Sequence, residues 1–340
     1  MIWLTFRQFR AQAVAGLAIL AAAAVYFLIS GLNLRHSYNA DLASCTPLGN
    51  CDDVLNQLQY DYDTPFNLSQ LLVTIAPALI GIFWGAPLIG RELESGTHQL
   101  AWNQSVMRTR WLAVKLAGVG LASIATAGVL SWLLTWWAGP LDQINGSRFG
   151  SMTFSTRDVV PLAYAAFAFA LGTTAGLLLR RTIPAMAVTL AVFIGIQILV
   201  PAVIRPNLLP SSTTTTAVNQ TTLSQAGGIE FHGPNTGGAM YIHGLPVAKG
   251  AWVLSTTPVE NSSGQVADMD TNNCFPGPSA KSLDLAQLGA CLAALNLHES
   301  VVYQPASHYW PLQWYETGIF LALAAALSGS CFWWIRRRQN

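Results

Sequence analysis

Charged residues are what this sequence has least of. Of its 340 residues only 10% are Asp, Glu, Lys or Arg, whereas 52% are hydrophobic. Soluble globular domains carry about 25% charged residues, so this chain has too few charges to cover the surface of a soluble globule of its size. The composition excludes that class and indicates an integral membrane protein.

Several patterns that mark catalysis or energy coupling are also missing. No ionisable residue is expected in the interior of the long apolar stretches, so no proton relay is evident. The chain has no HExxH motif, and its histidines lack a spacing typical of metal ligands. It also has no GxxxxGK(S/T) phosphate-binding loop, so any ATP must be bound by another subunit. We therefore expect no catalytic residue, no metal and no cofactor on this chain, which is not itself an enzyme.

Six uncharged stretches are long enough to cross a membrane, since about 20 helical residues span the roughly 30 Å hydrocarbon layer. They lie near residues 11–32, 71–89, 116–137, 159–179, 183–204 and 317–335. The second and fifth contain or adjoin Pro77, Pro87, Pro184 and Pro201, which should kink a helix or mark its end.

The N-terminal ten residues place aromatic and basic side chains on different sides of a helix. This pattern predicts a short interfacial helix before the first span, and a frayed terminus is the alternative. The first span itself could be a cleavable signal peptide. Its apolar run is longer than the about 7–15 residues usual for such a peptide, so we expect a membrane anchor.

The basic residues predict the orientation of the chain. If the N-terminus is cytoplasmic, 11 of the 17 Lys and Arg residues lie inside, close to span ends, and six lie outside. This distribution follows the positive-inside rule. We therefore expect a multi-pass protein of the cell membrane with both termini in the cytoplasm.

The chain divides into three parts by composition. Residues 1–204 hold five spans, residues 205–311 are long and polar enough to form an extracytoplasmic domain, and residues 312–340 hold the sixth span and a basic tail. The middle part is rich in Gly, Asn and Thr, which suggests loops and short strands. Leucines at helical spacing over residues 282–297 predict one amphipathic helix there.

Four of the five cysteines fall in segments expected outside the membrane, where the environment is oxidising. Cys45 and Cys51 are expected to close a short disulfide loop; a metal site is the alternative, but further Cys or His ligands are not nearby. Cys274 and Cys291 can join the amphipathic helix to the loop before it. Cys331 lies near the inner end of the sixth span and is expected to be an inert, buried thiol.

Residues 90–115, GRELESGTHQLAWNQSVMRTRWLAVK, place acidic and basic side chains between two long uncharged runs. We expect this segment at a membrane face, where something outside the bilayer binds. Gly96, Thr97 and the polar residues 103–105 predict a break between two helical pieces. A solvated connector is the alternative, but the positive-inside rule does not require the acids Glu92 and Glu94.

This segment resembles the cytoplasmic loop of ABC exporter permeases of the type-2 class. In that loop an E-x-x-x-G-T stretch is followed by a leucine, a polar break, a basic residue and a lysine that enters the third span. The matching residues are Glu92, Gly96, Thr97, Leu100, Arg108 and Lys115. Many members have a proline where this chain has Gln104 and Ser105. The order of the spans also agrees, and the stretch YQPASHYWPLQWYETGIF resembles actinobacterial permeases of this class.

The resemblance implies an all-α integral membrane protein. It would have six transmembrane helices, an N-terminal interfacial helix, a cytoplasmic coupling helix over about residues 90–110, and a small disulfide-stapled extracytoplasmic domain between the fifth and sixth spans. The coupling helix would sit in a cleft of a separate ABC ATPase subunit that binds ATP and magnesium. Its contact residues would be Glu92, Glu94, Gly96, Thr97, Leu100 and Arg108.

The implied function is ATP-driven export. Six spans are half of a transporter, so a second permease chain, identical or related, is implied as a partner, with membrane lipid around it and no nucleic acid. The uncharged lining favours an amphipathic or hydrophobic substrate such as a drug, peptide or lipid. Gln197 and Glu316 are candidate pathway residues, although Glu316 could simply cap the sixth helix. The alternative function is a membrane sensor whose extracytoplasmic domain binds an external ligand.

Overall fold

The computed structural model describes residues 2–44, 51–96, 107–232, 239–244, 247–267, 274 and 285–338. The chain forms two compact units. We call Met1–Arg205 with Trp310–Asn340 the helical unit, and Pro206–Tyr309 the inserted unit.

Among the described residues, six helical segments are long and apolar enough to cross a membrane. This finding confirms a multi-pass membrane protein. The helices of this part are α1 (Ile2–Ser44), α2 (Cys51–Ile80), η1 (Gly81–Gly85), α3 (Ala86–Glu94), α5 (Arg108–Trp137), α6 (Gly139–Asn145), α7 (Ser151–Thr156), α8 (Val160–Leu179), α9 (Thr182–Leu199), η2 (Val200–Ile204), η3 (Arg205–Asn207) and α12 (Tyr309–Arg338). The second span combines α2, η1 and α3, and the fifth combines α9, η2 and η3.

The first helix is longer than its apolar run predicts. α1 continues unbroken from Ile2 to Ser44, so the expected N-terminal interfacial helix is not a separate element. The part of α1 beyond the apolar run is held by packing, since Leu34 is fully buried in one core cluster with Leu58 and Trp137. Side-chain packing of this kind extends a helix beyond the membrane core.

Pro77, Pro87 and Pro201 lie at irregular turns inside two spans, whereas Pro184 lies in the first turn of α9, at the start of the fifth span. η1 is a π-helix that lies between Pro77 and Pro87, and η2 is a π-helix that contains Pro201. A proline has no N–H to donate and displaces the chain from regular helical geometry, so a wider turn nearby is its usual consequence.

α8 is the most buried of the six spans, and it contacts α2, η1, α3, α5, α7 and α9. Its small residues let other backbones approach closely. A Cβ atom added to Gly172 would lie 2.2 Å from the carbonyl oxygen of Gly81, and one added to Gly176 would lie 2.5 Å from that of Ala86. Only glycine fits at either position, so α8 and the η1–α3 segment form one tightly packed pair.

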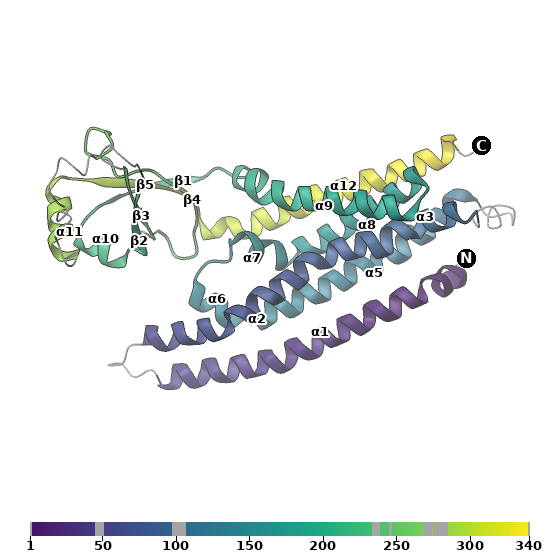
Figure 1. Cartoon of the computed structure of the whole chain (residues 1–340), viewed down its shortest axis with the longest axis horizontal. Helices are drawn as coiled ribbons and strands as arrows, with labels where there is room; N and C mark the ends of the chain where they lie inside the picture. The colour runs from purple at the N-terminus through teal and green to yellow at the C-terminus, as the bar shows by residue number, and fades with distance from the viewer. Residues whose placement is uncertain are drawn as a thin grey trace. The chain divides into compact units, whose positions relative to one another are not determined.

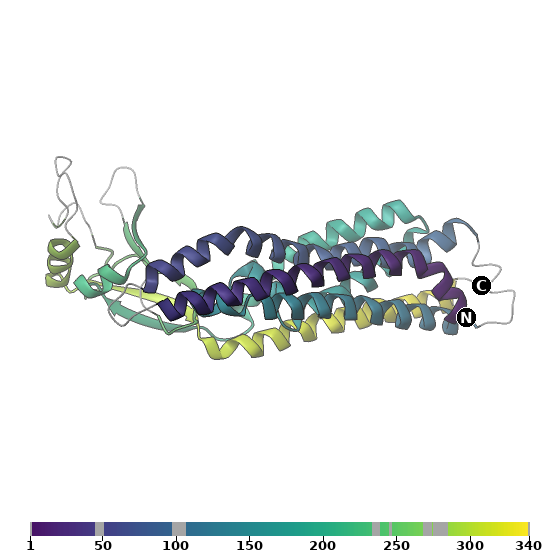
Figure 2. The same cartoon turned by 90° about the horizontal axis from the view of Figure 1, so that it is seen from below.

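Both chain termini lie at the same end of the helical unit, together with the end of α3 and the start of α5 (Figures 1 and 2). We call this the termini end. The opposite end, which we call the distal end, holds the last turns of α5, the start of α8 and the start of α12 (Figure 1).

The inserted unit contains two small antiparallel sheets, which confirms the short strands expected there. The chain as a whole is mostly helical, not all-α. Its elements are β1 (Ser212–Ala217), α10 (Gln220–Gln225), β2 (Gly228–His232), β3 (Ala239–His243), β4 (Trp252–Thr256), α11 (Leu285–Ala294), β5 (His298–Gln304) and η4 (Ala306–His308). The strand orders are β1-β5-β4 and β2-β3. In β1, alternate residues are partly buried and exposed, and β-branched threonines suit such a half-buried strand.

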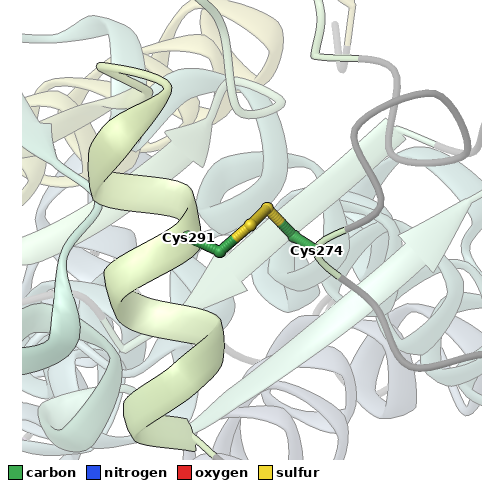
Figure 3. Close-up of a disulfide and its surroundings, with 2 residues drawn as sticks. All are labelled: Cys274 and Cys291. Atoms are coloured by element: carbon green, nitrogen blue, oxygen red, sulfur yellow. A yellow bond between two sulfur atoms is a disulfide. The ribbon is translucent and has the colours of Figure 1, made fainter.

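The amphipathic helix expected over residues 282–297 is present as α11. Its Leu288 and Leu292 are buried in the core of the inserted unit, beside Met240 and Ile242 of β3. The predicted disulfide between Cys274 and Cys291 is confirmed, and it joins α11 to the segment before it (Figure 3). Cys45 lies outside the described residues, so its pairing with Cys51 stays a prediction.

A buried carboxyl group, Glu299 of β5, lies in the same unit. Glu299 has no exposed surface, and its Oε1 accepts a hydrogen bond from the backbone N–H of Ile242 (3.2 Å). Its Oε2 has no hydrogen-bond partner among the described residues. Burial raises the pKa of Glu299 from 4.5 to about 7, although the Ile242 bond and His243 act in the opposite direction.

We expect the inserted unit to lose stability as the pH rises from about 4.5 through 7. The folded state keeps the Glu299 proton over this range, whereas the unfolded chain releases it near pH 4.5, so unfolding is favoured as pH rises. The effect is up to roughly 3 kcal/mol. Thermal unfolding of the full chain between pH 4.5 and 8 should show a pH dependence that Glu299→Gln removes. The exposed Glu230 supplies the control, Glu230→Gln; identical pH curves for wild type and Glu299→Gln would contradict the expectation.

Candidate functional site

An ion pair at the termini end joins two of the candidate spans. Glu92 lies in the last turn of α3, and its Oε1 is 2.5 Å from Nζ of Lys115 on α5. Both side chains are largely buried, with exposures of 14% and 4%. The Lys115 ammonium also lies 4.7 Å from the centroid of the Trp111 ring. Because a buried charge is costly without its partner, this pair holds α3 and α5 together.

A second carboxylate of the same turn reaches the fifth span. Oε2 of Glu94 accepts hydrogen bonds from the backbone N–H of Thr182 (3.0 Å) and from its Oγ1 (2.9 Å). Thr182 is the first residue of α9, where backbone N–H groups have no partner within the helix. A carboxylate is favoured at such a helix start. The last turn of α3 is therefore tied to α5 by Glu92 and to α9 by Glu94.

The predicted coupling helix over about residues 90–110 is not one element. Residues 90–94 form the end of α3, and Arg108 is the first residue of α5. Gly96 follows α3 with φ +71°, a conformation that glycine adopts readily. Thr97 and Leu100 lie outside the described residues. The role of Gly96, Thr97, Leu100 and Arg108 as contacts for an ATPase stays a prediction.

Below this polar layer, four helices meet in one apolar cluster. Its buried members are Ile89 of α3, Trp111 and Leu112 of α5, Leu177 of α8, and Cys331 and Ile335 of α12. Cys331 is a buried, free thiol, as predicted. Because protein interiors are close-packed, a displacement of α3 at this end must be shared by its three neighbours.

The distal end contains a buried ion pair between the end of the fifth span and the sixth. Arg205 Nε donates to Oε2 of Glu316 (2.8 Å), and its Nη2 donates to Oε1 (3.0 Å). Arg205 has no exposed surface and Glu316 is 1% exposed. This is the bidentate geometry in which arginine binds a carboxylate most strongly.

Neighbouring helices complete the hydrogen bonds of this pair. The Tyr164 hydroxyl of α8 donates to Oε1 of Glu316, and Arg205 Nη2 also donates to Oγ of Ser155 on α7 (2.7 Å). The Arg205 guanidinium carbon lies 4.2 Å from the centroid of the Phe154 ring. Together these contacts join η3, α12, α8 and α7, and we call them the distal network.

A buried amide extends the distal network along α12. Nε2 of Gln313 donates to the carbonyl oxygen of Phe154 (3.1 Å), and its Oε1 accepts from the N–H of Val160 at the start of α8 (3.2 Å). A second ion pair at this end joins Arg157 to Asp142 of α6 (3.1 Å). A charge-assisted bond thus joins α7 to Arg205 at the end of the fifth span, and another joins α6 to Arg157, the residue that follows α7.

The six uncharged runs of the sequence hold no Asp, Glu, Lys or Arg, but three charged residues that adjoin their ends are buried. Lys115, Arg205 and Glu316 all lie within candidate spans and are buried. The signal in the sequence was the position of Arg205 and Glu316, which have opposite charge and adjoin the fifth and sixth uncharged runs. Their separation of 111 residues hid the pairing. Glu316 also lies in the second turn of α12, so it does not cap that helix.

The two candidate pathway residues, Gln197 and Glu316, lie in different parts of the helical unit. Glu316 belongs to the distal network. Gln197 lies on α9, and its Nε2 is buried with no hydrogen-bond partner among the described residues. No hydrogen bond joins the two among the residues that the structure describes. A role of either in a substrate pathway stays a prediction.

Comparison with known proteins supports the membrane-transport interpretation. The family model described as ABC-2 membrane transporter related matches residues 17–205, which hold five of the six candidate spans. No curated protein and no solved structure matches the chain. The matched region covers more than half of the 340 residues and includes the end of α3 with both of its carboxylates. The chain therefore belongs to the ABC-2 membrane transporter related family.

Proposed function

We propose that this chain is the permease subunit of an ATP-driven exporter. A separate ABC ATPase subunit binds ATP and magnesium, and a second permease chain, identical or related, completes the transporter. The substrate is an amphipathic or hydrophobic molecule that leaves the cytoplasm. The family match supports the class of transporter, and the chain has no GxxxxGK(S/T) loop of its own.

The observation that carries this proposal is the attachment of the last turn of α3 to two other spans. Glu92 binds Lys115 of α5, and Glu94 binds Thr182 of α9. The ATPase contacts the stretch that follows this turn, which includes Gly96. A push on that stretch therefore moves α3, α5 and α9 together. In this proposal Glu92 and Glu94 transmit the movement within the permease and do not bind the ATPase directly.

The orientation follows from the same proposal. The termini end faces the cytoplasm, where an ATPase has access to ATP, and the inserted unit is extracytoplasmic. The disulfide between Cys274 and Cys291 supports this orientation, because disulfides persist on the oxidising side of a membrane.

Affinity purification of the full chain from its native membrane, followed by mass spectrometry, tests the assembly. We expect an ATPase subunit with a phosphate-binding loop to co-purify, together with a second permease chain of the same or a related sequence. A preparation that contains neither, or a signalling kinase instead, would overturn the proposal and favour the membrane-sensor alternative.

The purified complex also tests the transmission role of Glu94. We expect Glu94→Gln to lower the substrate transported per ATP hydrolysed by about tenfold, the effect of losing about 1.4 kcal/mol of coupling, because the amide is a weaker acceptor for the two bonds from Thr182. The ATPase should stay bound. Asp61→Asn supplies the control, since Asp61 is an exposed carboxylate that accepts a bond from Gln57. Unchanged coupling in Glu94→Gln would contradict the role, and loss of the ATPase would show a direct contact instead.

A further inference from the structure

An apolar cavity of about 470 Å³, partly open to the surface, lies between α1, the α2–η1 segment and α5. This volume falls within the range of about 300–1,000 Å³ that is typical of small-molecule sites. Six of its lining residues come from α1, five from α2 and η1, and two from α5. Only Gln12 and Thr126 among them are polar, and none is charged.

Both polar side chains of this cavity already have partners. Pro87 has no N–H to offer the carbonyl oxygen of Phe83, four residues before it, where a regular helix would form a bond. Nε2 of Gln12 donates to that oxygen instead (2.9 Å). Oγ1 of Thr126 donates to the carbonyl oxygen of Ala122 in its own helix (2.9 Å). The lining therefore offers few open polar atoms, and a buried water needs about two to four polar partners.

A glycine contact holds α1 close to η1 at one wall of the cavity. A Cβ atom added to Gly16 of α1 would lie 2.5 Å from Cζ2 of Trp84, so the indole ring rests against the α1 backbone. The Gln12 bond and this contact hold α1 against η1 along one side of the cavity. Ala11 and Ala15 of α1 also line it, and their small side chains leave its space open.

The position of the cavity among candidate membrane spans indicates the kind of molecule that fills it. All three walls belong to candidate membrane spans, whose surroundings in a bilayer are lipid acyl chains. We propose that this cavity is a binding site for one acyl chain of a membrane phospholipid. The chain fills an uncharged space that water occupies poorly, and it packs between α1 and the π-helical turn that Gln12 stabilises. This site is separate from Gln197 and Glu316, and its occupancy does not depend on the transport function.

The test uses the full chain in nanodiscs that contain a phospholipid with a photoactivatable diazirine on its acyl chain. After illumination, we expect mass spectrometry to find adducts concentrated on peptides that contain residues 11–20 and 76–84. In Ala15→Phe the added ring occupies the cavity, and the adducts on these peptides should fall by about tenfold. Ala11→Phe is a second filling variant, and both alanines are exposed, so neither change replaces a buried side chain.

The matched control is Leu121→Phe on α5. Leu121 is 66% exposed and does not line the cavity, so labelling of residues 11–20 and 76–84 should stay at the wild-type level. Two results would overturn the proposal. One is labelling spread evenly over the exposed faces of α9 and α12. The other is labelling of the cavity peptides that neither filling variant reduces.

Discussion

Replacing Glu316 by Gln is expected to destabilise the helical unit by about 3–5 kcal/mol, because it leaves Arg205 as an uncompensated buried charge. The bond from Arg205 Nη2 would lose its ionic character. The bond from Nε would be lost, because an amide nitrogen in place of Oε2 cannot accept a hydrogen bond. The Tyr164 hydroxyl would keep an acceptor, since the Gln amide oxygen can accept its hydrogen bond. The loss should therefore come from the unpaired charge and from one missing hydrogen bond of Arg205.

Reversible unfolding of the purified chain in mixed micelles, with increasing denaturing detergent, measures this effect. Glu230→Gln is the control, because Glu230 pairs with His243 at 53% exposure and exposed pairs contribute about 0–1 kcal/mol. The double variant Arg205→Met/Glu316→Leu should lose much less stability than Arg205→Met and Glu316→Leu lose together as separate single variants. No unpaired charge remains in the double variant. Additive losses would show that the two side chains act independently.

Replacing Gly172 by Ala is expected to destabilise the packing of α8 by about 3 kcal/mol, at the upper end for an overpacked core. The new methyl group would lie 2.2 Å from the carbonyl oxygen of Gly81 and 2.9 Å from the backbone nitrogen of Ala86. Both are backbone atoms, so no side chain can rotate away. α8 and η1 would have to separate, and their other close contacts would open with them.

Gly195→Ala is the matched control for this change. A Cβ atom at Gly195 of α9 meets nothing within 4 Å, and alanine favours a helix over glycine by about 1 kcal/mol. The same detergent titration should show a large loss for Gly172→Ala and no loss for Gly195→Ala. Equal behaviour of the two variants would mean that η1 can move to accept a side chain, and that the close approach is not required.

The six spans could be predicted from the sequence because each is an uncharged run of sufficient length. The lengths of the helices could not. Hydropathy reports which residues suit lipid, whereas α1 and α2 extend beyond their apolar runs because they pack against neighbouring helices. The Tyr38 hydroxyl of α1 donates to Oε1 of Gln143 on α6 (2.9 Å), a contact between residues 105 positions apart that no local pattern reveals.

At the candidate sites, too, the sequence indicated single residues but not the residues that they contact. The acids Glu92 and Glu94 were conspicuous in the sequence, because they stood among basic residues at a membrane face. Their partners were not, since Lys115 and Thr182 lie on other helices. Arg205 looked like the end of a span because charges normally mark such ends. Only a folded chain shows that the end is buried against Glu316.

The strand pairing of the inserted unit was hidden by distance along the chain. The Thr-rich run of β1 looked like low-complexity sequence, because its partner β5 begins about 80 residues later. Its register joins Ser212 to Tyr303 and Ala217 to His298. Pairing over such a separation is set by the packing of the whole unit and not by a turn between neighbours.

That pairing also determines how the inserted unit is attached to the rest of the chain. β1 is its first strand and β5 its last, and they are antiparallel neighbours. Adjacent strands lie about 4.8 Å apart, so the chain enters and leaves this unit at nearly the same point. The inserted unit is therefore a side domain whose two connections to the helical unit start from neighbouring points. Such a unit can be enlarged, reduced or exchanged over evolution without changing the distance that the chain must cover between α9 and α12.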